Sequence, residues 1–376
     1  MNNELEKFED SDDEPTLDLD FNMMKQLVSS RLDRNCVKTC RLSRGANNEI
    51  HLLQFDNGPD CIARLPRNSI NPAEKLACEV ATMKYIAQNT KIKVPEVYDW
   101  DCTTHNIIKF PYILMERLPG QHLYRVWDEL TIENKINVLS QIVDILFEIW
   151  NKCQFNEIGC LYMNKGRDAI PSFTGPFKSS REWFDVLIQK EKCFFETHGV
   201  QVLIDKMNMN LADAEKRTAE LVKQLALLQL KLSKNNPFES IDLPPFTLIH
   251  YDFDAQNILV DWSSVDNTIK IVGIIDWEFS HTGTLWELCD YPIWIQEIEY
   301  EPYEFVSDKE LQRNQENQGL RVHFRNEVIK IFGEKGGKIL DMKEKDRRIE
   351  SLETMFTMVH GFSMLECYLR CFIDQF

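Results

Sequence analysis

Residues 247–260 read Thr-Leu-Ile-His-Tyr-Asp-Phe-Asp-Ala-Gln-Asn-Ile-Leu-Val, a pattern of an apolar strand, a polar loop and a second apolar strand. A predicted turn over residues 261–267 leads to a third apolar strand, Lys270-Ile-Val-Gly-Ile-Ile275, which ends at Asp276. Polar side chains that follow buried strands are usually displayed at a cleft, where catalytic groups are found. The pattern therefore predicts a catalytic site at the ends of these strands.

Phosphoryl transfer requires the residue types found in these loops. The metal ion that holds the phosphates prefers hard oxygen ligands, which Asn257 and Asp276 offer. A separate carboxylate must accept or orient the proton of the attacking hydroxyl group, and Asp252 can do so. Four residues separate Asp252 from Asn257, as in the catalytic loop of kinases, and Asp276 follows Asn257 by 19 residues. The alternative is that these are unrelated polar residues that cap turns.

His250 begins the polar loop, and two roles are open to it. It can brace the loop through backbone hydrogen bonds, or it can transfer protons. By analogy with kinase loops we expect the bracing role.

The first third of the chain predicts a small antiparallel sheet. Asp56-Asn57-Gly58 is a strong hairpin signal because Asn-Gly suits positive φ. In the strand that follows, Ile62 and Arg64 should share one face, since side chains alternate along a strand. The predicted strands are residues 37–42, 49–55, 61–65 and 112–116.

A helix should follow the third of these strands. Asn71 can cap its start, Pro72 suits its first position, and Glu74 has the spacing of a capping box. Glu79 lies three residues after Leu76, which places it at the buried edge of this helix. A carboxylate in that position needs a cation. Beyond residue 131 the apolar spacing becomes helical, and residues 176–198 and 211–233 also predict helices.

Composition excludes several classes of protein. The chain has 376 residues and a formal net charge of -17, which argues against a nucleic-acid partner. It has no run of 18 apolar residues, so no membrane span is expected. Residues 1–20 carry nine acidic residues and one lysine, unlike a signal or transit peptide. The 11 cysteines include no C-x-x-C pair and are expected to be reduced thiols, so the predicted location is cytoplasmic.

Two segments resemble the signature motifs of the aminoglycoside phosphotransferase family, which includes choline-kinase-like enzymes. They are His250-Tyr-Asp252-Phe-Asp-Ala-Gln-Asn257-Ile-Leu-Val-Asp261 and Ile274-Ile-Asp276-Trp-Glu278-Phe. A third segment, Phe155-Asn-Glu-Ile-Gly159-Cys-Leu-Tyr162, is similar to one common in an uncharacterised fungal branch of that family. The resemblance covers roughly residues 37–292, although only the first two motifs are specific.

This resemblance implies an α+β, protein-kinase-like bilobal fold, with a small antiparallel-sheet lobe, one key helix, and a larger, mainly helical lobe. We expect residues 1–20 to form an acidic disordered tail. The nucleotide-binding lobe is then residues 21–117, and residues 118–376 hold the catalytic loop, the metal site and the substrate pocket.

The resemblance also implies an ATP-dependent small-molecule kinase that uses Mg²⁺ and an alcohol group as acceptor. The catalytic base of the family maps onto Asp252, and its metal ligands map onto Asn257 and Asp276. Its nucleotide-binding cation and the glutamate of the key helix map onto Arg64 and Glu79.

The segment Met115-Glu116-Arg117-Leu118 links the two predicted lobes. The resemblance implies that its backbone groups, at Glu116 and Leu118, bind adenine.

Two departures from the family pattern favour a different function, a pseudokinase that binds nucleotide without turnover. The strand cation is an arginine instead of a lysine, and the two are not interchangeable at a phosphate site. The predicted phosphate loop has one glycine, Gly45, where protein kinases carry G-x-G-x-x-G. A protein kinase is disfavoured because the chain lacks an A-P-E motif.

The acceptor is a small molecule in this interpretation. Three acidic residues near the predicted cleft would suit an aminated acceptor, such as an amino alcohol or an aminoglycoside. A solvated or capping role for each of them is the alternative. These residues are Glu278, Glu287 and Asp290.

Overall fold

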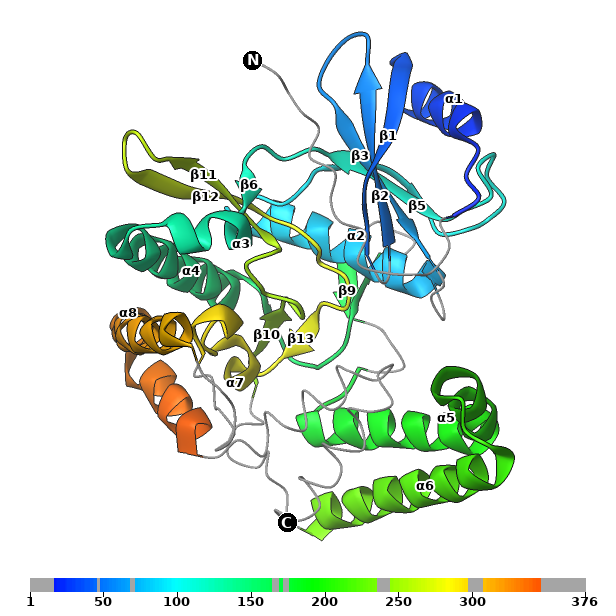
Figure 1. Ribbon diagram of the computed structural model, residues 1–376, viewed down its shortest axis with the longest axis vertical. Coiled ribbons are helices and arrows are strands. Elements are labelled where there is room, and N and C mark those ends of the chain that lie inside the picture. The colour runs from blue at the N-terminus through cyan, green and yellow to red at the C-terminus, as the bar shows by residue number, and fades with distance from the viewer. Residues whose placement is uncertain are drawn as a thin grey trace.

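A computed structural model describes residues 17–45, 48–67, 72–163, 169–171, 176–234, 244–296 and 307–345. Most of the predicted acidic tail and the predicted helix cap Asn71 lie outside these described residues. Figure 1 shows the sheet of the N-terminal part above the mainly helical C-terminal part.

The N-terminal part is built on a five-stranded antiparallel sheet with strand order β1-β2-β3-β5-β4. Each predicted strand is present, and β4 was not predicted. The strands are β1 Cys36–Arg44, β2 Asn48–Phe55, β3 Cys61–Pro66, β4 Val97–Asp101 and β5 Tyr112–Glu116.

The two faces of this sheet are covered by two helices. Helix α1, Phe21–Leu32, is capped by the side chain of Asp20 and packs its buried Met24 against the face that holds Ala63. Helix α2, Pro72–Asn89, packs buried residues such as Leu76 against the opposite face, which holds Ile62. The alternation predicted along β3 is therefore confirmed, and it directs Arg64 towards α2.

Gly120 marks the passage from one sheet to another. It has φ +96°, and a Cβ there would lie 2.7 Å from the carbonyl oxygen of Val260. Only glycine tolerates both the left-handed backbone and the close approach. The next residues, β6 (Gln121–His122), pair with β11 in the C-terminal part, whereas β5 belongs to the N-terminal sheet.

The C-terminal part contains two small three-stranded sheets, ordered β13-β10-β7 and β12-β11-β6. Strand β10, Phe246–Ile249, is fully buried, and the antiparallel pair β11 (Ile258–Ser263) and β12 (Thr268–Ile274) follows it. The short elements around them are α3 Leu123–Val126, β7 Gln154–Phe155, β8 Leu161–Met163, β9 Ala169–Pro171, β13 His281–Gly283, α7 Leu285–Leu288 and 3-10 helices at Trp127–Glu129 and Ile293–Ile295.

Long helices enclose these strands. Helix α4, Ile132–Lys152, begins at the cap residue Thr131 and buries an apolar stripe that includes Val138 and Ile142. Helix α8, Asp308–Lys345, packs on α4 and is interrupted at Gly333, where φ is +72°. Helices α5 (Ser180–Met207) and α6 (Leu211–Lys234) form an antiparallel hairpin, seen at the lower right of Figure 1. No helix within the described ranges is long and apolar enough to span a membrane.

Candidate active site

The loop between β10 and β11 presents Asp252 to solvent. Its Oδ2 accepts hydrogen bonds from the side-chain amides of Asn257 at 2.9 Å and Gln256 at 3.1 Å. Its Oδ1 has no hydrogen bond within the described residues. The neutral amides therefore fix the carboxylate in position and leave one oxygen able to accept a proton from a bound hydroxyl group.

His250 supports this loop from inside the protein. Its Nε2 lies 2.9 Å from the backbone carbonyl of Ile275, and its ring stacks near Trp277 with centroids 4.4 Å apart. Burial lowers the pKa of His250, so the imidazole is neutral and Nε2 donates to that carbonyl. This contact matches the bracing role expected for His250.

Asn257 and Asp276 are brought together by the β11–β12 pair. Ile258 pairs with Ile274, and the amide of Ile275 donates to the carbonyl of Asn257 at 2.9 Å. Asp276 follows directly and has φ +63°, a left-handed conformation that non-glycine residues rarely adopt. Such strain is typical of functional sites, because the surrounding structure must hold it.

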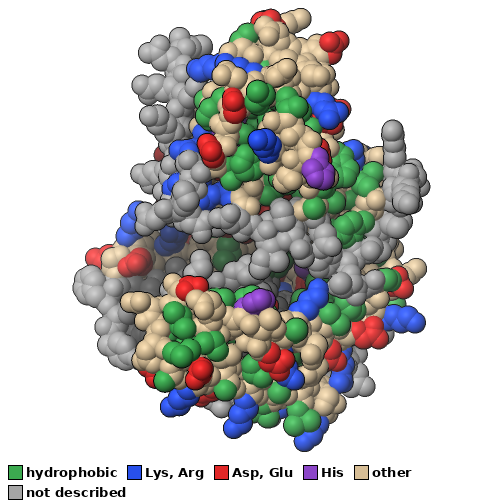
Figure 2. All heavy atoms as spheres, turned by 90° about the vertical axis from the view of Figure 1, so that its right-hand side faces the viewer, with side chains coloured by type: hydrophobic (Ala, Val, Ile, Leu, Met, Phe, Trp, Pro, Cys, Tyr) green, Lys and Arg blue, Asp and Glu red, His purple; other side chains and the backbone are tan. Residues whose placement is uncertain are grey.

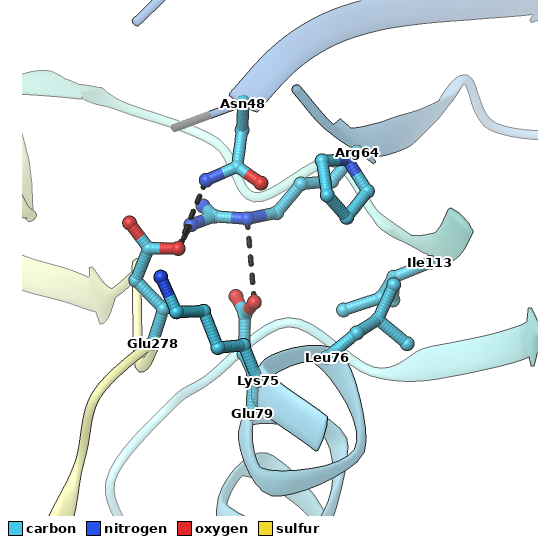
Figure 3. Close-up of a pocket in the computed structure, with 8 residues that line it drawn as sticks. Asn48, Arg64, Lys75, Leu76, Glu79, Ile113 and Glu278 are labelled. Atoms are coloured by element: carbon cyan, nitrogen blue, oxygen red, sulfur yellow. Dashed lines mark hydrogen bonds and ion pairs between the residues drawn. The ribbon is translucent and has the colours of Figure 1, made fainter. Parts of the chain in front are cut away.

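Arg64 connects the N-terminal sheet to this site through three carboxylates, of which Figure 3 shows Glu79 and Glu278. Its Nη2 lies 2.6 Å from Oδ1 of Asp276 and 3.1 Å from Oε2 of Glu278, and its Nε lies 3.3 Å from Oε2 of Glu79. We call these four residues the Arg64 cluster. Residues 64 and 276 are 212 positions apart, so this contact joins the two parts of the molecule.

Burial and charge act in opposite directions within the Arg64 cluster. Burial raises the pKa of Glu79 to about 8, against the opposing effect of Arg64. Burial alone would also raise the pKa of Asp276, but the guanidinium of Arg64 holds it below its usual value. The Arg64 side chain is 6% exposed, and the three carboxylates raise its pKa despite burial. The cluster is thus an inward-facing charge network with more carboxylates than cations.

A small cavity lies beside the Arg64 cluster, between β3 and α2. Asn48 at its edge donates from Nδ2 to Oε2 of Glu278 at 3.0 Å. Lys75, one helical turn before Glu79, extends into the same region in Figure 3. The residues that line the cavity are Asn48, Arg64, Pro66, Lys75, Leu76, Glu79, Ile113 and Glu278.

The donor set fits a magnesium ion with few protein ligands. Asn257 uses its Nδ2 to bond Asp252, so its Oδ1 faces elsewhere and can act as a ligand. Together with the carboxylate of Asp276 it supplies the hard oxygens that Mg²⁺ prefers. The described residues contain no group of three or more His, Cys, Asp and Glu arranged to hold a metal. Mg²⁺ is commonly bound by one or two such ligands, with substrate phosphates and waters completing the shell.

Glu116 and Leu118 lie at the predicted link between the lobes, away from the Arg64 cluster. The amide of Glu116 donates to the carbonyl of Glu96 at 2.8 Å, and its carboxylate pairs with Lys93 at 2.6 Å. Leu118 is buried against Gly273. The adenine-binding role of this segment stays a prediction.

The three acidic residues considered for acceptor binding are all engaged within the protein. Glu278 belongs to the Arg64 cluster, and Glu287 forms a capping box with Thr284 and a 3.0 Å contact with His281. Asp290 accepts from Lys343 at 2.8 Å. A capping role is therefore what the structure shows for Glu287.

Sequence reasoning missed three polar residues of the site. Gln256 bonds Asp252, Asn48 bonds Glu278, and Lys75 lines the cavity. Only Lys75 carried a usable signal, because a residue four positions before Glu79 must share its helix face.

The face of the molecule drawn in Figure 2 gives no comparable indication of function. Figure 2 shows basic, acidic and hydrophobic side chains interspersed over the described part of the face that it presents. The net charge of -17 is thus not gathered into one acidic patch on that face.

The fold can now be compared with known proteins. A solved ternary complex of streptomycin, ATP and APH(2")-IIa has a TM-score of 0.51 and 11% sequence identity, with 93% of each chain covered. At this identity the likeness concerns the fold alone. The predicted α+β, protein-kinase-like bilobal fold is confirmed, and it defines the chain as kinase-like in architecture.

The sequence profile of the phosphotransferase enzyme family matches residues 38–288. The chain therefore belongs to the phosphotransferase enzyme family, as its two motifs predicted.

Similar proteins are found in fungi. A subtelomeric hrmA-associated cluster protein of Aspergillus fumigatus is 33% identical over 156 residues, which cover 39% of this chain and 30% of that protein. An altered inheritance of mitochondria protein 9 of Lachancea thermotolerans is 26% identical over 211 residues, which cover 52% of this chain and 34% of that protein. The chain thus matches about a third of the length of these relatives.

The predicted cytoplasmic location is wrong in the light of these relatives. The Lachancea protein and others of the same name are described as mitochondrial. The prediction relied on reduced thiols, and the nine cysteines that the structure describes are indeed free. Free thiols argue only against an oxidising compartment, so they could not separate the cytosol from a mitochondrion.

Proposed function

We propose that this protein is an ATP-dependent phosphotransferase that moves the γ-phosphate of ATP to a hydroxyl group of a small molecule. The observation that carries the proposal is that three groups lie close together. Asp252 keeps one carboxylate oxygen without a hydrogen bond to the described residues, Asn257 and Asp276 meet across the β11–β12 pair, and Arg64 contacts Asp276 from the N-terminal sheet.

In this proposal Asp252 is the base that accepts or orients the hydroxyl proton of the acceptor. The amides of Asn257 and Gln256 hold its Oδ2, so the proton goes to Oδ1 without rearrangement of the loop. Fixed geometry of this kind lowers the reorganisation needed in the transition state.

Asn257 and Asp276 would hold Mg²⁺, which neutralises charge on the phosphates when it is bound. Arg64 would lose its 2.6 Å contact with Asp276 in that state, because the carboxylate then faces the metal ion. The guanidinium keeps Glu79 as a partner and gains the phosphates. Glu116 and Leu118 would offer backbone groups to adenine.

A nucleotide-binding module without turnover is the second candidate function. The pairing of Arg64 with Asp276 favours it, because a cation already occupies a predicted metal ligand. The complete set of Asp252, Asn257 and Asp276 favours catalysis, since each group has a separate part in phosphoryl transfer.

Nucleotide binding and turnover can be measured separately to test the proposal. We expect ATP with Mg²⁺ to raise the thermal unfolding temperature, and a library of amino alcohols, aminoglycosides and other alcohols to contain an acceptor that yields ADP. Asp252→Asn should keep nucleotide binding and lower turnover about 100-fold or more, because it removes the base. The matched control is Asp261→Asn, an exposed residue of β11 that should leave turnover unchanged.

Two results would contradict the proposal in different ways. An absence of nucleotide binding would exclude both candidate functions. Binding without ADP formation from any acceptor, or ADP formation that Asp252→Asn leaves unchanged, would favour the binding module.

A further inference from the structure

Lys75 is a cation at the cavity beside the Arg64 cluster, near Glu278 but not in an ion pair with it. It lies on α2 one turn before Glu79, and its side chain is half-buried. Its Nζ sits 4.6 Å from the centroid of the Phe279 ring. Among the residues that the structure describes, Lys75 makes neither a hydrogen bond nor an ion pair. An ammonium group in a partly dry site without such partners is unfavourable unless an anion arrives.

Arg64, in contrast, is fully engaged. Asp276, Glu278 and Glu79 all lie within 3.3 Å of its guanidinium nitrogens. Burial keeps the proton on Glu79 below about pH 8, so Asp276 and Glu278 are the charged carboxylates of the cluster at neutral pH, and both already contact the one guanidinium. A bound nucleoside triphosphate would add further negative charge next to the Arg64 cluster. Arg64 alone cannot compensate for its own carboxylates and for the phosphates.

The position of Lys75 suits a phosphate ligand. It lines the cavity with Arg64 and Asn48, and in Figure 3 its ammonium end lies on the same side of α2 as the Arg64 guanidinium. Burial lowers the pKa of Lys75, and the nearby Glu278 opposes that effect. The energetic cost of burial would be offset by an anion that contacts Nζ directly.

We propose that Lys75 is a second phosphate-binding cation of the nucleotide site, which acts together with Arg64. This inference rests on the proposed function, since it assigns a residue to the nucleotide of that reaction. When nucleotide binds, the ammonium leaves the Phe279 ring and contacts phosphate oxygens, and Arg64 continues to balance Glu79. A lysine from α2 thereby adds a point charge to the guanidinium that β3 contributes to the same phosphates.

A purely structural role for Lys75 makes a different prediction. Its alkyl stem could simply pack on Phe279, in which case its loss would disturb all ligands of the cleft alike. A phosphate contact affects only ligands that carry phosphates. The comparison of ATP with adenosine therefore separates the two roles.

The experiment uses Lys75→Met, which keeps an unbranched apolar side chain and removes the charge. Dissociation constants for ATP with Mg²⁺ and for adenosine are measured by titration calorimetry on the full chain. We expect Lys75→Met to raise the dissociation constant of ATP about tenfold or more, which corresponds to the loss of a charged hydrogen bond. The dissociation constant of adenosine should change by less than about twofold. Lys75→Arg should recover most of the affinity for ATP.

The matched control is Lys84→Met on the same helix. Lys84 lies nine residues later and, at 100° per residue, points about half a turn away from Lys75. The Lys84→Met variant should bind ATP and adenosine as tightly as the wild type does. Lys75→Gln provides a second neutral variant if Lys75→Met unfolds at a lower temperature than the measurement allows.

The outcomes distinguish this inference from the proposed function. A folded Lys75→Met or Lys75→Gln variant that binds ATP as tightly as the wild type overturns the inference and leaves the proposed function intact. Equal weakening of ATP and adenosine also overturns it, in favour of packing. A wild-type protein that binds neither ligand overturns both.

Discussion

Two regions of the candidate site hold their carboxylates in different ways. The first, here called the upper side, is the Arg64 cluster, in which Glu79 from the N-terminal part and Asp276 and Glu278 from the C-terminal part contact one buried guanidinium at 2.6 to 3.3 Å. On the lower side, Asp252 is held by the neutral amides of Asn257 and Gln256 at 2.9 and 3.1 Å and is open to solvent.

This difference separates a region that must rearrange from one that need not. The upper side has its charges paired internally, so a metal ion or a phosphate has to displace an existing ion pair there. On the lower side, neutral amides orient the carboxylate of Asp252 without neutralising its charge. In the proposed reaction this carboxylate needs no rearrangement before it accepts a proton from a bound hydroxyl group. We therefore expect ligand binding to rearrange mainly the Arg64 cluster. The proposed proton transfer should take place at Asp252.

The largest expected effect comes from removing the cation of the upper side. Arg64→Met leaves Asp276 and Glu278 without the guanidinium that pairs with them, beside the buried carboxyl group of Glu79, and should lower the free energy of unfolding by about 3–5 kcal/mol. Urea unfolding in the absence of nucleotide measures this change. Arg117→Met is the matched control, because Arg117 is 47% exposed and pairs with Asp60 at 3.3 Å, a contact worth about 0–1 kcal/mol. Equal effects of the two variants would show that the cluster is not a buried network.

A smaller effect should follow when the lower side is given the charge character of the upper side. Asn257→Asp removes the amide that donates to Asp252 at 2.9 Å and places two carboxylates together. We expect a loss of about 1–3 kcal/mol in the free energy of unfolding, part of which millimolar Mg²⁺ restores. Asn137→Asp, on the exposed face of α4, should show neither the loss nor the Mg²⁺ response. A loss that Mg²⁺ does not change would argue against a metal ligand at position 257.

A third expected effect is a pH dependence carried by Glu79. Its pKa is raised from 4.5 to about 8, mainly by burial. Below pH 4.5 the carboxyl is protonated in both the folded and the unfolded chain. Between pH 4.5 and about pH 8 the unfolded chain releases the proton, whereas the folded chain keeps it. The free energy of unfolding therefore falls as the pH rises through this range, and the contribution of protonated Glu79 is lost above about pH 8.

Glu79→Gln lacks this titration and tests it. Thermal unfolding temperatures of wild type and Glu79→Gln, measured from pH 5 to pH 9, should converge on the acid side. The wild type should become progressively less stable than the variant towards pH 8. Parallel curves for the two proteins would contradict the raised pKa.

The sequence predicted the local elements of the active site well. The strands around residues 247–276 and the start of the helix near residue 131 depend on short-range pattern, and they are present within three residues of the predicted bounds. Asp252 and Asn257 belong to one short loop, as their interval predicted, and their side chains are joined there by a hydrogen bond that the sequence did not predict. The predicted alternation on β3 also depends on short-range pattern and was confirmed.

Other parts depend on tertiary contacts that no local pattern carries. Strand β4, Val-Tyr-Asp-Trp-Asp, is only half-buried and exists because it pairs with β5. Helix α8 is mostly polar, and its buried positions, such as Leu320 and Phe324, become visible only where it packs on α4. Helix α1 was missed although Met24, Leu27 and Val28 have helical spacing.

The Arg64 cluster is the part of the site that sequence reasoning could only approach. Glu79 at a buried helix edge indicated the need for a cation, and Arg64 was a candidate from the family resemblance. The third and fourth partners, Asp276 and Glu278, lie more than 200 residues away along the chain. Their pairing with Arg64 follows from how the two parts pack, which no spacing in the sequence encodes.

The glycine that separates the two sheets has a consequence for motion. Before it, Glu116 is fixed to Glu96 in the N-terminal sheet, and after it, Gln121 is fixed to Val260. A rotation of one lobe against the other should therefore change the backbone φ and ψ angles of residues 117–120, which would act as a hinge. His122, next to this pivot, contacts the carbonyl of Gln256 through Nδ1. Any such rotation moves Gln256, which also holds Asp252, so the relative position of the lobes and the orientation of the proposed base are mechanically linked.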